Sequence, residues 1–284
     1  MSIVTTPYTP PNLAPRFQPP TGWKTSYFKN RNGASLRYAY ALPEGEAPDA
    51  VVVILPGLRE FCELYCETTN DILAQNLGVF VIDWLCQGGS DRLLNNPHKR
   101  HTMSFASDMR DLDEWLNNQV LPRLDAAYDM RPPLVMLGHS MGGNIGLAHL
   151  HARRGRFSCA AFTAPMLGIA AFRHMPDWLT RVFTEAADQP LMRRAYVPGA
   201  GDWSPALRNR MLTRLYTSDT ERGDLHNKWL AENPELRIGN ITWKWLLEAE
   251  RACHRIMLPD LLKRIEIPSL LAMAGRDAFV ERYD

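Results

Sequence analysis

The sequence is poor in cysteine, carries almost no net charge and has no long apolar run. Its five cysteines are an odd number in 284 residues, so they cannot all form disulfides, and reduced thiols in a cytosol-like compartment are the simpler expectation. The net charge of +1 gives no electrostatic reason to expect nucleic acid or an anionic membrane as the main partner. A membrane-spanning helix needs roughly 20 apolar residues in succession, and no stretch provides them.

Metal-binding and secretion signals are absent as well. Cys62 and Cys66 lie four residues apart, but no further Cys or His nearby completes a set of metal ligands, so no metal site is expected. Residues 1–20 lack the basic start and the apolar centre of a signal peptide. They are rich in proline, which predicts an extended arm that lies on the surface or is disordered.

Apolar runs alternate with helix-like segments between residues 25 and 165. Asn32-Gly33 predicts a hairpin between two short strands. Four runs are continuously apolar, as in strands of a parallel sheet covered on both faces: 50–57, 78–84, 133–137 and 159–165. Helices are expected between them at 61–76, at 105–120 with Ser104 as N-cap, and at 142–152. The alternation predicts an α/β fold in which a mainly parallel sheet is flanked by helices.

The pattern changes after Pro165, where a mostly helical segment interrupts the alternation until strand character returns at 267–275. We therefore expect a proline-rich arm at 1–24, an α/β core at 25–165, a helical cap at 166–262, and a C-terminal part of the core at 263–284. Five of the eight tryptophans follow Pro165: Trp178, Trp203, Trp229, Trp243 and Trp245. They either form a core for the inserted helices or line a pocket beneath the cap.

Ser140 lies in the sequence LGHSMGGN, residues 137–144, between an expected strand and an expected helix. A G-x-S-x-G turn in this context forces the serine into a strained backbone conformation and exposes its Oγ at the carboxyl end of the sheet. Side chains at Gly138 and Gly142 would collide in so tight a turn. Ser140 is therefore predicted to be a nucleophile that attacks a carbonyl, rather than an incidental serine in a glycine-rich turn.

Attack on a carbonyl also requires hydrogen-bond donors for the oxyanion. The backbone N–H of Met141, at the start of the expected helix, is one donor. The second should come from the loop after the first parallel strand, LPGLREF. There Gly57 allows a close approach of the backbone, and the N–H of Leu58 is the expected donor.

Four segments match the motifs of one superfamily. GHSMGG matches the nucleophile turn, and LPGLREFCELY a His-Gly-x-x-Glu loop with Pro56 in place of the histidine. DWLCQGGSDR matches an Asp-x-x-Gly-x-Gly-x-Ser-Asp loop, with Gln87 and Gly88 in its variable middle, and LLAMAGRDAFV the strand and loop that present an acid. Over residues 27–284 the chain resembles the α/β-hydrolase superfamily in its lysophospholipase and monoacylglycerol-lipase branch.

The resemblance implies a serine hydrolase that cleaves lysophospholipids or monoacylglycerols through an acyl-enzyme on Ser140, with no cofactor. It implies that Asp277 is the acid that orients a histidine. The partner would be a small lipid ester, and the protein would be cytoplasmic or peripheral at a membrane, with transient membrane contact through the cap. Head group, chain length and oligomeric state stay open.

The expected order in the chain is serine, acid, histidine, but no histidine follows Asp277. His139 adjoins Ser140, yet successive residues at such a turn point apart. The others are expected on the following helix (His149 and His151), in a structural loop (His98 and His101) and in the cap (His174, His226 and His254). We therefore expect no catalytic histidine within residues 1–284, and we expect the base to lie beyond residue 284, with the last strand and helix of the fold.

Two other functions stay open. The lack of a histidine after Asp277 would fit a non-catalytic lipid-binding pseudo-hydrolase. The same fold could also carry peroxidase-like, lyase or thioesterase chemistry.

Overall fold

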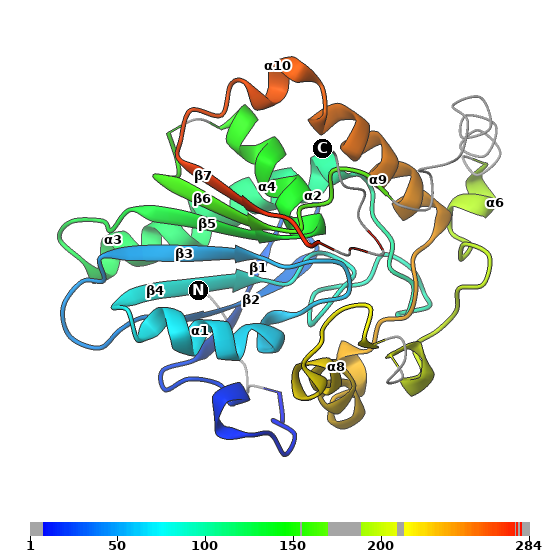
Figure 1. Ribbon diagram of the computed structural model, residues 1–284, viewed down its shortest axis with the longest axis horizontal. Helices are drawn as coiled ribbons and strands as arrows, with labels where there is room; N and C mark the ends of the chain where they lie inside the picture. Colours follow the sequence, from blue (N-terminus) through cyan, green and yellow to red (C-terminus); the bar gives the residue numbers. More distant parts are fainter. Residues whose placement is uncertain are drawn as a thin grey trace.

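A computed structural model describes residues 8–153, 155–169, 189–208, 213–275, 277 and 279. Within them, strands form one sheet in the order β1-β2-β4-β3-β5-β6-β7 (Figure 1). Their bounds are β1 Lys24–Lys29, β2 Ser35–Ala41, β3 Ala50–Leu55, β4 Leu77–Ile82, β5 Leu134–His139, β6 Cys159–Thr163 and β7 Ser269–Ala272. The β1–β2 and β2–β4 pairings are antiparallel and the other four are parallel. The predicted α/β fold with a mainly parallel sheet is confirmed.

Helices cover both faces of the sheet (Figure 1). The 3₁₀ turn η2 (Cys62–Tyr65) and helix α1 (Cys66–Leu73) pack on β4 on one face. The other face carries α2 (Phe105–Trp115), the π-helical turn η3 (Leu116–Val120), α3 (Leu121–Ala127) and α4 (Met141–Ala152). As predicted, Ser104 caps α2, and its Oγ accepts the N–H of Ser107 at 3.1 Å.

Strands β3 and β4 are buried on both faces, which explains their continuous hydrophobicity. In β3, Val51, Val53 and Leu55 pack in the cluster that includes Trp115 and Leu116. Val52 and Ile54 point the other way, into the cluster that contacts Ile72 of α1. Because successive side chains of a strand point to opposite faces, a strand with a core on each side has no position left for polar residues.

Residues 166–262, which we call the cap segment after the sequence prediction, include among their described parts α6 (Pro190–Arg193), η5 (Pro205–Arg208), α8 (Thr220–Glu232), η6 (Pro234–Leu236), α9 (Trp243–Ile256) and α10 (Pro259–Leu262). Of these, α6, α8 and α9 lie beyond the carboxyl ends of the parallel strands (Figure 1). Trp245 packs against Phe105 of α2 with ring centroids 5.8 Å apart, and Trp229 is buried in a cluster with Phe61. These two tryptophans pack between the cap segment and the core. Trp178 lies outside the described residues.

The described part of the N-terminal arm packs on the protein surface. Phe17, in the 3₁₀ turn η1 (Pro15–Phe17), is 2% exposed and shares a hydrophobic cluster with Phe61 and Trp229. Arg16 donates to Glu221 of α8 at 2.7 Å. The arm thus touches both the core and the cap segment.

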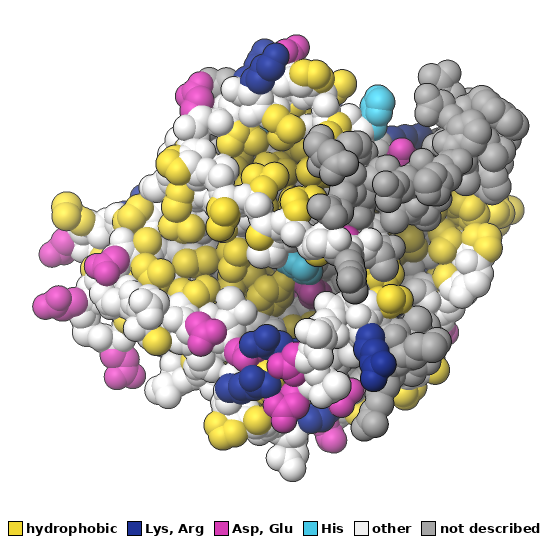
Figure 2. Space-filling model, viewed as in Figure 1, with side chains coloured by type: hydrophobic (Ala, Val, Ile, Leu, Met, Phe, Trp, Pro, Cys, Tyr) yellow, Lys and Arg dark blue, Asp and Glu magenta, His cyan; other side chains and the backbone are white. Residues whose placement is uncertain are grey.

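Strand β7 forms one edge of the sheet, and all four of its residues are exposed. Leu270 and Leu271 are 65% and 47% exposed, and Figure 2 shows hydrophobic side chains gathered over the β5–β7 part of the sheet.

In the described part of the chain, no helix combines the length and the hydrophobicity needed to cross a bilayer.

Candidate active site

Ser140 occupies a sharp turn between β5 and α4. Its φ of 48° and ψ of −115° put a non-glycine residue in a sparsely populated region of the backbone map, where strain persists only if the surroundings enforce it. A Cβ on Gly142 would lie 2.0 Å from the carbonyl oxygen of Leu55, and one on Gly138 would lie 2.9 Å from the Cα of Gly143. The backbone of Ser140 therefore has the predicted strained conformation, and a side chain at either glycine would collide with neighbouring backbone atoms, as predicted.

A cavity of about 310 Å³ opens beside Ser140. It is lined from five places in the chain: the loop after β3, the turn after β5, the residue that follows β6, the cap segment and the segment after β7. The lining residues are Gly57, Leu58, Arg59, Glu60, His139, Ser140, Ala164, Leu215, Tyr216, Ala274, Asp277 and Phe279. The cavity thus brings together Ser140, Leu58 and Asp277, and Met141 directly follows the serine in the chain.

The loop after β3 is fixed by hydrogen bonds to its backbone. Gly57 N–H donates to Glu60 Oε2 at 2.6 Å, and Gln87 Nε2 donates to the carbonyls of Gly57 and Glu60 at 2.9 and 2.8 Å. Trp84 Nε1 donates to the Pro56 carbonyl at 2.8 Å. These contacts order the loop although Pro56 stands where the resembling enzymes often have a histidine.

The backbone amides of Leu58 and Met141 are free to donate. Among the described residues, neither N–H has a hydrogen-bond acceptor. Met141 is the first residue of α4, where helix N–H groups have no partner within the helix and favour negative charge. The two amides are therefore the kind of donor that an oxyanion requires.

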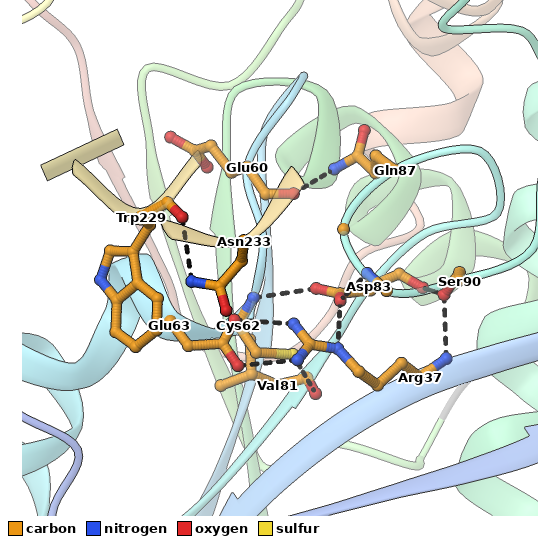
Figure 3. Close-up of polar contacts among 12 residues, drawn as sticks. Arg37, Glu60, Cys62, Glu63, Val81, Asp83, Gln87, Ser90, Trp229 and Asn233 are labelled. Atoms are coloured by element: carbon orange, nitrogen blue, oxygen red, sulfur yellow. Dashed lines mark hydrogen bonds and ion pairs between the residues drawn. The ribbon is translucent and has the colours of Figure 1, made fainter. Parts of the chain in front are cut away.

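A buried ion-pair network links η2, which follows the loop after β3, to strand β2 and to the loop after β4 (Figure 3). The Arg37 guanidinium donates to both Glu63 carboxylate oxygens at 2.7 Å and to Asp83 Oδ2 at 2.6 Å. Asp83 Oδ1 in turn accepts the N–H of Cys62 at 2.8 Å. All three charged side chains are at most 3% exposed. The two carboxylates raise the pKa of Arg37 against the opposing effect of burial, so the arginine stays charged.

Asp277 lies beyond β7 and lines the cavity with Ser140. Its Oδ1 accepts the N–H of Phe279 at 2.8 Å. The Phe279 ring stacks on Tyr216 of the cap segment, with centroids 4.7 Å apart. The loop that carries Asp277 is therefore held against the cap segment.

No histidine in the described part of the chain forms a hydrogen bond with Ser140 Oγ. His139 lines the same cavity, but its Nδ1 is 2.9 Å from Thr163 Oγ1 and its Nε2 is 3.7 Å from Glu60 Oε1. Burial lowers the pKa of His101 and of His149 to about 4, which fits neutral packed side chains.

Three further described histidines contact other parts of the chain. His226 Nε2 is 3.2 Å from the Arg59 carbonyl, His151 Nδ1 is 3.2 Å from the Leu261 carbonyl, and His98 Nδ1 accepts the N–H of Trp203. His254 is exposed near the end of α9. His174 lies outside the described residues.

Three residues near the site have roles that sequence reasoning missed. Gln87 is fully buried and fixes the loop after β3, although it occupies the variable middle of a motif. Arg37 and Arg59 carried no signal, because an arginine in a strand or a loop is usually a solvated surface residue. Only the folded chain shows that both are buried.

Comparisons with known proteins agree with this geometry. The family model described as serine aminopeptidase, S33 matches residues 46–284. Lysophospholipase L2 of Escherichia coli (strain K12) is 30% identical over 241 residues, which cover 82% of this chain and 68% of that protein. The probable lysophospholipase L2 of Haemophilus influenzae is 24% identical over 258 residues, or 90% of this chain and 77% of that one.

Solved structures show the same fold. A soluble variant of monoglyceride lipase from Saccharomyces cerevisiae has a TM-score of 0.66 at 14% identity, covering 97% of this chain and 82% of that one. The monoacylglycerol lipase of Paleococcus ferrophilus has a TM-score of 0.56 at 18% identity, covering 83% and 76%. The chain therefore belongs to the serine aminopeptidase S33 family of α/β-hydrolases, in the branch that resembles lysophospholipases and monoacylglycerol lipases.

Proposed function

We propose that this protein hydrolyses carboxylic esters of lipids, either lysophospholipids or monoacylglycerols, through an acyl-enzyme on Ser140. One observation carries the proposal: a serine with φ of 48° shares a cavity with Asp277 and with Leu58, whose amide has no acceptor among the described residues. The 30% identity to an Escherichia coli lysophospholipase L2 supports the same class of substrate. The comparisons give no support to a non-catalytic pseudo-hydrolase.

In the proposed mechanism, Ser140 Oγ attacks the acyl carbonyl while its proton passes to a histidine base. The amides of Leu58 and Met141 donate to the oxyanion of the tetrahedral intermediate. Collapse of the intermediate expels the glycerol oxygen, which takes the proton from the histidine and leaves as the alcohol. Water then attacks the acyl-serine by the same route and releases the fatty acid.

Asp277 would hold the histidine in the right tautomer and stabilise the imidazolium that forms. We assign the base to none of the seven described histidines, because no hydrogen bond joins any of their ring nitrogens to Ser140 Oγ. The test therefore uses the longest chain that the gene encodes alongside residues 1–284.

We also propose that the protein works in the cytoplasm and touches lipid surfaces transiently through the cap segment. Leu191, Leu258 and Leu215 of this segment are 89%, 51% and 49% exposed. Exposed apolar side chains near a lipid-ester site are suited to contact with a membrane or micelle surface. Cosedimentation with phospholipid vesicles tests this contact, and no binding at any vesicle composition would refute it.

The experiment measures fatty acid release from a lysophospholipid and from a monoacylglycerol with the same acyl chain. We expect Ser140→Ala to lower kcat by about 10³-fold or more, and Asp277→Asn by about 10²- to 10⁴-fold. The matched control is Ser158→Ala, at an exposed serine, which should leave kcat unchanged. Full activity in Ser140→Ala would refute the mechanism.

A further inference from the structure

Arg59 stands next to the proposed oxyanion donor Leu58 in a conformation that few arginines adopt. Its φ is 65°, in the left-handed region that costs energy for a residue with a Cβ. The backbone is held on both sides, because Arg59 N–H donates to Gln87 Oε1 at 3.3 Å and its carbonyl lies 3.2 Å from His226 Nε2. These two backbone contacts therefore fix the position from which the Arg59 side chain leaves the main chain.

The side chain lines the same cavity as Ser140 and is only 8% exposed. Its Nη2 donates to the hydroxyl of Tyr216 at 3.2 Å and its Nη1 to Asn240 Oδ1 at 3.4 Å. Both partners are neutral and belong to the cap segment. The guanidinium thus lies at the boundary between the cap and the cavity.

Among the described residues, no carboxylate lies within 4.0 Å of the Arg59 guanidinium. The nearby carboxylates have other partners. Glu60 Oε2 accepts from Gly57 N–H and from the Tyr65 hydroxyl, both at 2.6 Å, and Asp277 Oδ1 accepts from Phe279 N–H. Arg37, by contrast, is buried with two carboxylates. A buried cation without a counter-ion is costly, and an anionic ligand in the cavity would remove that cost.

We infer that Arg59 recognises the phosphate of a lysophospholipid head group while the ester carbonyl lies at Ser140. This inference rests on the proposed function and selects between its two substrate classes. A guanidinium matches phosphate geometry with paired N–H donors. In a lysophospholipid only the glycerol carbons separate the ester from the phosphate, and in the protein only one peptide bond separates Arg59 from Leu58. A monoacylglycerol has no charge for Arg59 to meet.

The test measures binding, so it needs no turnover. The Ser140→Ala variant of the full chain is titrated with 1-O-octylglycerophosphoglycerol, with 1-O-octylglycerol and with inorganic phosphate. Adding Arg59→Gln should weaken binding of the phospholipid analogue about 10- to 100-fold, the range for loss of charge-assisted hydrogen bonds. It should change binding of the neutral analogue less than about 3-fold. Arg59→Lys should restore part of the loss, and the control Arg131→Gln, at an exposed arginine, should change neither.

Several results would overturn the inference. An equal loss for both lipids would make Arg59 a structural link between cap and core, and no loss for either would remove it from head-group binding. Inorganic phosphate that binds as tightly as the phospholipid analogue, with the same dependence on Arg59, would point to a free-anion site. If the enzyme cleaves esters but Arg59→Gln fails to discriminate, only this inference falls. If no ester is cleaved at all, the proposed function falls, and the binding result stands by itself.

Discussion

Replacing Arg37 by methionine should strongly destabilise the fold. The substitution keeps most of the apolar side chain and removes the cation that donates to Glu63 and Asp83. Asp83 would keep the N–H groups of Cys62 and Gly89 at 2.8 and 2.7 Å. Glu63, with 3% exposure, would lose both of the N–H groups that donate to its carboxylate. Most of the cost should therefore come from one buried, unpaired carboxylate.

Removing one partner of a buried ion pair typically costs about 3–5 kcal/mol, so we expect that loss in the free energy of unfolding. For a domain of this size it corresponds to a fall in Tm of roughly 6–20 °C. Urea titration monitored by tryptophan fluorescence measures the loss of stability. Trp84 and Trp115 are buried in the core, so their fluorescence should change when the protein unfolds. Arg37→Met/Glu63→Met should recover much of the loss, because it removes the orphaned charge as well.

The matched control is Arg131→Met. Arg131 also pairs with a carboxylate, Asp125, at 2.6 Å, but the two side chains are 45% and 49% exposed. Exposed pairs contribute about 0–1 kcal/mol, so this control should hardly change the urea midpoint. If Arg37→Met costs no more than Arg131→Met, the reasoning about the buried network is wrong.

Three further predictions concern the turn, the pH dependence and the arm. Gly142→Ala should lower kcat at least about 100-fold. Its Cβ would lie 2.0 Å from the Leu55 carbonyl oxygen and would therefore displace the turn that holds Ser140. Activity within twofold of wild type in an ester assay would contradict this prediction. Burial lowers the pKa of His149 to about 4 in the folded protein, so the unfolded state binds more protons below pH 6.5; the contribution of His149 to stability should fall by about 2 kcal/mol between pH 7 and pH 5, and urea titrations should find the total fall reduced in His149→Gln but not in His254→Gln. Phe17→Ala should destabilise the protein by about 3 kcal/mol, since Phe17 is 2% exposed between core and cap, and a Tm within 1 °C of wild type would show that the arm is not anchored there.

The strands of the core could be predicted closely from the sequence. Runs such as residues 50–55 have a core on each face, so their hydrophobicity is continuous and easily recognised. The expected helix at 105–120 was too short, because the chain continues as α3 to Ala127. Pro122 falls in the first turn of α3, after the π-helical turn, where a proline removes no hydrogen bond of α3.

The site could be predicted in part. Ser140 lies in a local motif whose geometry depends on neighbouring residues, so strand, turn and helix could all be inferred from one segment. The partners of Arg37 are 26 and 46 residues away, and only the sheet order brings β2 beside β4. That no described carboxylate pairs with the Arg59 guanidinium was equally hidden, because the ion pairs of a side chain cannot be recognised before the fold is known.

The measurement that tests the central claim most directly is trapping of the acyl-enzyme. The longest encoded chain is mixed with 4-nitrophenyl octanoate, quenched with acid during turnover, and analysed by intact mass and peptide mapping. We predict one octanoyl group per chain, located on Ser140, and none in Ser140→Ala. Turnover with no acyl group on Ser140, or an acyl group on another residue that survives in Ser140→Ala, would contradict the account.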